Sequence, residues 1–172
     1  MKRVVLTGAE STGKSTLARE LARHFNAPHS TEYVRAFVDE TQRAPQATDL
    51  EAIAKGQIAL EDACRPSNKE GLVIHDTNLL SNLIYAEHYF GGNLDWLVAQ
   101  FNARRYDLYL LCLPDFPWVP DHGQREGPEA RDALHQKFLL RLEAMQLPFT
   151  TIGGCPEERL QTAIRCIQTL GV

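Results

Sequence analysis

The chain has 172 residues, which is the length of one ordinary domain. Its composition, 44% hydrophobic and 23% charged, is typical of a globular protein and excludes an intrinsically disordered one. The formal net charge of −4 disfavours a general nucleic-acid binder, because such proteins usually carry a net basic face. The chain contains no run of about 18 apolar residues and no secretory-signal pattern, so we expect no membrane segment.

The four cysteines, Cys64, Cys112, Cys155 and Cys166, show no C-x-x-C spacing. Cys112 lies within an apolar run and is expected to be a small core residue. We therefore expect neither a zinc site nor a disulfide framework, and we take a reduced, cytoplasmic protein as the default.

Strand-like and helix-like segments alternate along the whole chain. In chain order, the predicted segments are strand 3–7, helix 14–25, strand 29–31, helix 48–64, strand 72–75, helices 79–84 and 94–101, strand 108–113, helix 134–145, strand 149–152 and helix 160–167. Thr48 and Glu51 have the spacing of a capping box. This order predicts an α/β fold with a parallel sheet of about five strands and helices on both faces, formed by one domain over residues 1–172.

Residues 8–15, GAESTGKS, match the pattern G-x-x-x-x-G-K-[ST] between an apolar strand and an amphipathic helix. Gly8 and Gly13 allow backbone angles that turn amide N–H groups toward phosphate oxygens. Lys14 is placed to reach the β- and γ-phosphates, and the Ser15 hydroxyl is placed to ligate Mg²⁺. The segment therefore predicts a site for a nucleoside triphosphate.

Asp76 ends the buried run LVIH and fits the Walker B role of holding Mg²⁺, directly or through water. Its simpler alternative is an aspartate that only caps the next helix. The run from Asp76 to Leu79 lacks the glycine of the D-x-x-G switch of GTPases, which favours a kinase over a switch protein.

Glu32 and Arg35 follow the second predicted strand, and the C-terminal ends of parallel strands face the ligand crevice. Glu32 could therefore take a proton from an acceptor hydroxyl, and Arg35 could contact phosphate or the acceptor. The simpler alternative is a capping glutamate and a solvated arginine.

Residues 114–128, PDFPWVPDHGQREGP, interrupt the regular alternation, and a loop of this length in a compact domain is usually functional or disordered. Trp118 could stack on a ring, a cationic ring most of all, or it could anchor the loop in the core. Arginines on such a segment, Arg125 and Arg131, could neutralise charge on a transferring phosphoryl group. We predict a lid over about residues 114–131.

The segments GAESTGKSTL, EYVR, KGQ, DTN, YDLYLLCLPD and PWVPDHGQR together resemble the ribosylnicotinamide kinase domain of the NadR family, over essentially the whole chain. In that family this domain transfers the γ-phosphate of ATP to the 5′-hydroxyl of nicotinamide riboside, which gives nicotinamide mononucleotide. The resemblance implies Mg·ATP at the loop residues Gly8, Ala9, Glu10, Ser11, Thr12, Gly13, Lys14, Ser15 and Thr16. It implies acceptor contacts around Glu32, Tyr33, Arg35, Gln57, Asp76 and Trp118, and a lid with Asp121, Arg125 and Arg131.

The chain departs from the family pattern at two places. Many members carry a second acid at the position of Asn78, and one extra residue separates Asp121 from Arg125. Full-length members also carry a DNA-binding segment and an adenylyltransferase domain, and we expect neither in this chain.

The prediction is thus an ATP-dependent small-molecule kinase, a ribosylnicotinamide kinase by its resemblance, whose partner is a small nucleoside. Lys14, with Mg²⁺ held by Ser15 and Asp76, would neutralise the phosphates. The sequence leaves open whether Glu32 or Asp76 deprotonates the acceptor.

Trp118 and Tyr33 would hold the nicotinamide ring, and Arg125 or Arg131 would close over the transition state. Two alternatives stay open: a kinase of thiamine or another nucleoside, and a nucleotide-binding regulatory ATPase module. Oligomeric state, the residues at adenine, and the preference for ATP over GTP are not indicated by the sequence.

Overall fold

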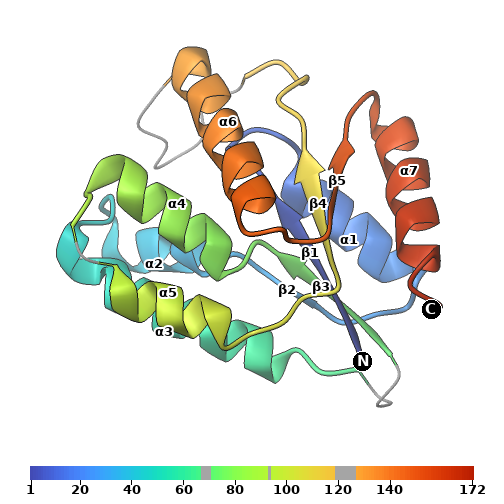
Figure 1. The fold of residues 1–172 in the computed structure, drawn as a ribbon, viewed down its shortest axis with the longest axis horizontal. Coiled ribbons are helices and arrows are strands. Elements are labelled where there is room, and N and C mark those ends of the chain that lie inside the picture. Colours follow the sequence, from blue (N-terminus) through green and yellow to red (C-terminus); the bar gives the residue numbers. More distant parts are fainter. Residues whose placement is uncertain (67–70, 93, 119–126) are drawn as a thin grey trace.

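The computed structural model of the chain describes residues 1–66, 71–92, 94–118 and 127–172. Its centre is a sheet with strand order β2-β3-β1-β4-β5, in which every neighbouring pair is parallel (Figure 1). The strands are β1 (Lys2–Thr7), β2 (His29–Ser30), β3 (Leu72–Asp76), β4 (Leu108–Cys112) and β5 (Phe149–Ile152). The predicted parallel five-stranded sheet is confirmed, and β1 lies at its middle.

Helices cover both faces of the sheet, as the alternating order predicts (Figure 1). On one face lie α1 (Lys14–His24) and α7 (Pro156–Gln168), which pack on Val4 and Leu6 of β1. Val5, which points the other way, belongs to the core under the remaining helices. These are α3 (Leu50–Ala63), α4 (Leu79–Tyr89), α5 (Asp95–Asn102) and α6 (Pro128–Ala144).

Two local features differ from the sequence prediction. Helix α2 (Tyr33–Thr41) forms where no helix is predicted, and it packs against α3. Phe37 is its one buried residue, but Val34, Phe37 and Val38 have the spacing of one helix face, a signal that the sequence prediction did not use. The predicted Thr48–Glu51 capping box is wrong: the box joins Gln46 and Asp49 around the 3₁₀ turn Ala47–Asp49, and α3 begins after it.

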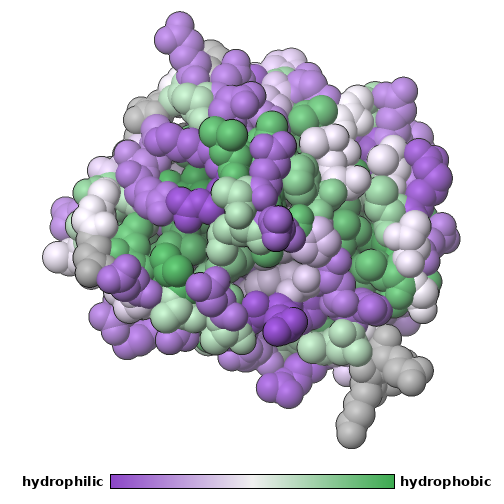
Figure 2. All heavy atoms as spheres, viewed as in Figure 1, coloured by the Kyte–Doolittle hydropathy of each residue, from purple (hydrophilic) through white to green (hydrophobic). Residues whose placement is uncertain are grey.

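The surface of the face in Figure 2 carries hydrophobic side chains in small groups between hydrophilic ones. Large hydrophobic side chains with considerable exposure are Met1, Trp96, Leu140 and Val172. Scattered exposure of this kind is ordinary and marks no binding surface by itself. Among the described helices, none has the length and apolar character needed to cross a membrane.

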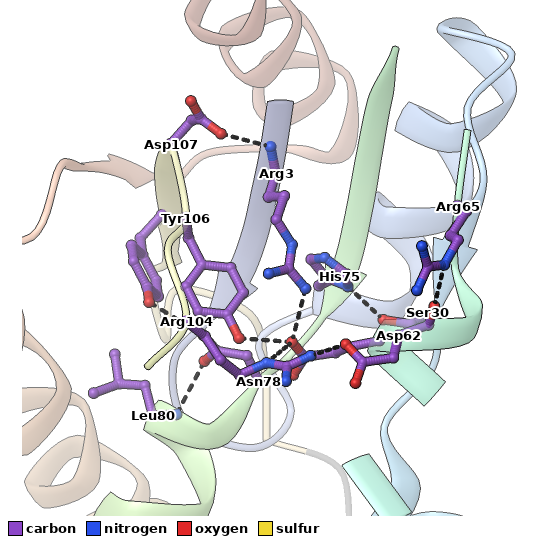
Figure 3. Close-up of polar contacts among 12 residues, drawn as sticks. Arg3, Ser30, Asp62, Arg65, His75, Asn78, Leu80, Arg104, Tyr106 and Asp107 are labelled. Atoms are coloured by element: carbon purple, nitrogen blue, oxygen red, sulfur yellow. Dashed lines mark hydrogen bonds and ion pairs between the residues drawn. The ribbon is translucent and has the colours of Figure 1, made fainter. Parts of the chain in front are cut away.

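A buried ionic cluster fixes α3 to the sheet. The Glu61 side chain has no exposed surface, and its Oε2 atom accepts a hydrogen bond from the Tyr106 hydroxyl at 2.6 Å. Arg3 and Arg104 each place a guanidinium nitrogen 3.4 Å from the same oxygen (Figure 3). Burial raises the pKa of Glu61, and these partners oppose that rise. The cluster ties α3 to β1 and to the segment before β4.

His75 lies on β3 beside this cluster and has a structural role. Its Nδ1 atom is 2.8 Å from the Ser30 hydroxyl, which joins β3 to β2 (Figure 3). Burial, together with the charges of Arg3 and Arg104, lowers the pKa of His75 to about 3. The imidazole is therefore neutral near pH 7, and its contacts are structural.

We expect Glu61→Ala to lower the free energy of unfolding by about 3 kcal/mol, because it leaves Arg3 and Arg104 without their buried carboxylate. Glu51→Ala is the matched control, since Glu51 lies on the same helix in an exposed pair with Lys55 and should change stability by about 0.5 kcal/mol or less. Urea unfolding followed by circular dichroism measures both. Equal effects of the two substitutions would contradict a stabilising role of the cluster.

Candidate functional site

The loop between β1 and α1 has a backbone path that requires glycine at two positions. Gly8 has φ +127°, and a Cβ atom there would lie 2.9 Å from the carbonyl oxygen of Cys112 on β4. Gly13 has φ +78°, and a Cβ atom there would lie 2.9 Å from Cε2 of Phe116. Both angles are costly for side-chain-bearing residues, so the two glycines of the sequence pattern are explained by backbone angle and by space.

The loop closes around a small cavity at the N-terminus of α1. The Thr12 hydroxyl and the Lys14 ammonium both donate to the carbonyl oxygen of Ala9, at 2.8 and 2.5 Å. Gly13 provides no side-chain cap, which leaves N–H groups of the first helical turn available to an anion. The cavity has a volume of about 180 Å³ and is lined by residues 11–16 and Arg35.

A larger cavity of about 380 Å³ adjoins the first. Its walls come from α2, α3, α4 and the phosphate loop, and they include Glu10, Lys14, Glu32, Val34, Arg35, Val38, Ile53, Gln57, Ser81, Tyr85, Tyr89 and Phe90. Lys14 and Arg35 line both cavities. A phosphate group bound in the smaller cavity would therefore face a molecule bound in the larger one across these two cations.

Two buried polar side chains in the large cavity have atoms without a partner in the described structure. Gln57 is 1% exposed; its Oε1 atom accepts from the Tyr33 backbone N–H at 2.9 Å, and its Nε2 atom has no partner there. Ser81, also buried, has an unpartnered hydroxyl. Buried polar groups nearly always find a hydrogen bond, so both atoms are suited to a polar ligand.

Glu32 lines the larger cavity, at the first position before α2. Its carboxylate accepts a hydrogen bond from Nε of Arg35 at 3.0 Å, and its side chain is 18% exposed. Burial raises the pKa of Glu32 above its ordinary value; Lys14 lowers it and Asp76 raises it by smaller amounts. A carboxylate with a raised pKa is well suited to accept a proton.

Asp76 ends β3 and is 4% exposed, and its Oδ1 atom has no partner in the described residues. The next residue, Thr77, has φ +68°, an uncommon angle for a β-branched residue. Its N–H is held by the Leu6 carbonyl at 3.0 Å. Strained backbone of this kind is found most often at functional sites.

Asn78 has a structural role. Its Oδ1 atom accepts from the Leu80 N–H at 3.1 Å and caps α4, and its Nδ2 atom donates to the Tyr109 hydroxyl at 3.1 Å. A carboxylate at this position could cap the helix but could not donate to Tyr109.

The residues fit the Mg²⁺ that the sequence pattern implies. Asp76 offers a buried oxygen without a partner, and Ser15 offers a hydroxyl at the first turn of α1. The described residues contain no cluster of three or more carboxylate, histidine or cysteine side chains that could form a metal site. Mg²⁺ usually takes one or two protein ligands and completes its shell with phosphate and water, so the Asp76 and Ser15 oxygens are enough protein ligands for it.

Helix α4 supplies an aromatic wall that the sequence prediction missed. The Tyr85 hydroxyl donates to the Glu10 carboxylate of the phosphate loop at 2.8 Å, and burial raises the pKa of Tyr85, which keeps it a neutral donor. The rings of Tyr85 and Tyr89 are stacked with centroids 6.1 Å apart. Ser81, Tyr85 and Tyr89 repeat at a spacing of four, which was the available signal for one helix face.

Several predicted residues lie apart from these cavities. The Tyr33 ring packs on α3 at Gly56, and neither it nor the half-buried Trp118 lines the large cavity. Arg131 is buried on α6 and donates to the carbonyl of Phe116 at 2.8 Å. Asp121 and Arg125 lie outside the described residues.

The sheet order, the 8–15 loop and the two adjoining cavities are those of a P-loop protein that binds a nucleoside triphosphate. A family model described as AAA domain matches residues 3–159, and the chain belongs to this family of P-loop proteins.

Two curated relatives are the trifunctional NAD biosynthesis/regulator protein NadR of Escherichia coli strain K12 and its namesake of Salmonella typhimurium strain LT2. They are 29% identical to the chain in alignments of 176 and 147 positions, and these alignments cover 98% and 83% of the chain. The alignments cover 42% and 35% of the relatives, so the chain spans less than half of their length. The predicted resemblance to the NadR family is confirmed.

Among solved structures, a NadR protein in complex with NR matches with TM-score 0.82 and 26% identity, over 98% of this chain and 51% of that one. A NadR protein in complex with NAD and AMP-PNP matches with TM-score 0.82 and 26% identity, over 99% and 50%. Deoxyadenosine kinase from M. mycoides with bound dATP matches with TM-score 0.62 over 98% of this chain and 100% of that one. At 12% identity, this last likeness shows a shared fold alone.

We expect Gly8→Ala to weaken binding of a nucleoside triphosphate by at least about tenfold, because the new Cβ pushes the loop away from β4. Gly92→Ala is the matched control: Gly92 has φ +86° but no described atom within 4 Å of a built Cβ, so it bears only the cost of the backbone angle. Titration calorimetry with Mg·ATP measures both. Similar affinities of the two variants would show that the close approach to Cys112 does not shape the loop.

Proposed function

We propose that the chain is an ATP-dependent kinase that phosphorylates the 5′-hydroxyl of nicotinamide riboside to give nicotinamide mononucleotide. The observation that carries the proposal is the pair of adjoining cavities that share Lys14 and Arg35. A phosphate-sized cavity on one side and a cavity of about 380 Å³ on the other fit a triphosphate donor and a nucleoside acceptor in contact. The likeness to a NadR protein in complex with NR supports this choice of acceptor.

The acceptor cavity combines negative charge with aromatic rings. Glu10, Glu32 and Asp39 line it, and Tyr85, Tyr89 and Phe90 add ring faces and edges. The cationic pyridinium ring of nicotinamide riboside suits such walls, since a cation gains from both carboxylates and aromatic faces. Gln57 and Ser81 have free donors for its amide or ribose oxygens. We assign the ring to the α4 wall; the predicted roles of Trp118 and Tyr33 remain predictions.

In the transfer, the acceptor hydroxyl oxygen bonds to the γ-phosphorus, the bond from that phosphorus to the β–γ bridging oxygen breaks, and ADP leaves. Lys14 and the helix N-terminus stabilise the charge on the phosphate oxygens. Glu32 takes the proton of the acceptor hydroxyl, because its raised pKa and its place beside Lys14 suit a base. Bound Mg²⁺, held by Ser15 and Asp76, would supply further positive charge at the phosphates.

The lid over about residues 114–131, with Asp121, Arg125 and Arg131, stays part of the proposal. Arg131, at its described end, is buried and donates to the Phe116 carbonyl, and this contact supports a role for Arg131 at the base of such a lid. Its reach to a phosphoryl group remains a prediction.

The direct test is acceptor-dependent ADP production with Mg·ATP across nicotinamide riboside, dihydronicotinamide riboside, thiamine, uridine and adenosine. We expect the turnover of nicotinamide riboside to exceed that of the neutral nucleosides by at least about tenfold, because among the nucleosides of this panel only it places a cation beside the carboxylates of the cavity. The dihydro compound has nearly the same shape without the charge and should show the raised KM of a neutral acceptor. Mass spectrometry identifies the product.

Lys14→Ala is the control for this assay and should lower the rate by orders of magnitude while the protein stays folded. Robust turnover of another acceptor alone would contradict the nicotinamide riboside assignment. Slow ATP hydrolysis without any acceptor dependence would favour the regulatory ATPase alternative.

We expect two carboxylate variants to separate the base from the metal ligand. Glu32→Gln should lower kcat by about 10²–10⁴-fold at any Mg²⁺ concentration, because it removes the base. Asp76→Asn should also lower kcat, but a high Mg²⁺ concentration should restore part of the lost activity, because this substitution weakens a metal contact. The wild-type kcat should fall on acidification through a pKa above 4.5, since the base must be deprotonated and burial raises the pKa of Glu32. The reverse Mg²⁺ response would assign the base to Asp76.

A further inference from the structure

A buried arginine of α7 contacts three loops of the nucleotide half of the site. The Arg159 side chain is 3% exposed and donates from Nη1 to the carbonyl of Thr12 in the phosphate loop at 2.9 Å. Its Nη2 atom donates to the Leu113 carbonyl at 2.9 Å and pairs with the Asp115 carboxylate, and its Nε atom donates to the Gly154 carbonyl at 2.9 Å. Arg159 thus joins the phosphate loop to the segments after β4 and β5.

A second set of contacts reinforces this junction. The Asp115 carboxylate accepts from the Gly154 N–H at 2.6 Å, so the segments after β4 and β5 are also bonded directly. The Arg159 guanidinium lies 4.1 Å from the Phe116 ring centroid, and that ring approaches Gly13 of the phosphate loop. Gly153 is held close to Leu113 and Asp115, with no space for a Cβ atom.

The contact with Thr12 has a consequence for phosphate binding. In a trans peptide group the C=O and N–H bonds point in opposite directions. A guanidinium that holds the Thr12 carbonyl outward therefore turns the Gly13 N–H to the inner side of the loop, where phosphate oxygens bind. A charge-assisted hydrogen bond is among the stronger ways to fix that peptide plane.

We infer that Arg159 is a positioning residue for the nucleotide: it sets the Gly13 peptide plane of the phosphate loop and links it to the segments that follow β4 and β5. It acts on ATP and leaves the acceptor cavity unaffected, because none of its partners lines that cavity. Its kinetic consequences rest on the proposed kinase function, whereas its effect on nucleotide affinity does not.

Arg159→Lys tests the inference, since lysine keeps the charge but its single ammonium cannot serve four acceptors on three loops. We expect the Kd of Mg·ATP by titration calorimetry, and the KM for ATP, to rise about tenfold. The KM for nicotinamide riboside should stay within about twofold. Arg165→Lys is the matched control, because Arg165 lies on the same helix and donates to the Thr162 hydroxyl one turn away at 3.0 Å, in an exposed contact within α7.

Asp115→Asn is the second variant and covers the case in which Arg159→Lys does not fold. This substitution leaves the three carbonyl contacts of Arg159 in place and removes only the negative charge of its partner Asp115. The affinity for Mg·ATP should therefore fall, but by less than in Arg159→Lys. An unchanged ATP affinity in a folded Arg159→Lys protein would overturn the inference, as would equal rises in both KM values. If no acceptor is phosphorylated, the proposed function fails, and calorimetry still decides the role of Arg159.

Discussion

The turn of the chain between β1 and α1 is the constraint on which the rest of the site depends. At Gly8 the backbone meets the carbonyl of Cys112 on β4, and at Gly13 it meets the ring of Phe116 just beyond that strand. The phosphate loop is thus shaped from outside as well as by its own hydrogen bonds. The contact with Cys112 exists because β4 lies next to β1 in the sheet. The shape of the phosphate loop therefore depends on the order of the strands.

The acceptor side depends on the placement of three helices rather than on one loop. Helix α3 is fixed by Glu61, whose buried carboxylate holds two arginines, and one helical turn earlier it presents Gln57 to the cavity. Helix α4 is capped by Asn78 and reaches the phosphate loop through Tyr85 and Glu10. Buried polar contacts that are costly to break therefore position the groups that meet the ligand.

The sequence was informative where periodicity or a short motif carries the signal. The strands, the 8–15 loop and the position of Asp76 at the end of β3 follow from local pattern. Helix α2 was missed although Val34, Phe37 and Val38 have helical spacing, and the hydrogen bond from Tyr85 to Glu10 was missed because the two residues are 75 positions apart in the sequence. Arg159 lies 147 residues from Thr12, so no local pattern could have joined them. Contacts between distant segments are fixed by topology, which single-sequence patterns do not contain.

The chain has a net charge of −4 and still offers a candidate site for an anion, because the charge around that site differs from the charge of the whole chain. Lys14 and Arg35 line both cavities, whereas Glu10 and Glu32 line only the larger one. An acceptor with a positive ring and a donor with negative phosphates would then lie against walls of opposite charge. Under the proposed function, the carboxylates of the larger cavity would favour a cationic nucleoside over a second triphosphate, while Lys14 and Arg35, shared by the two cavities, would lie beside the transferred phosphate.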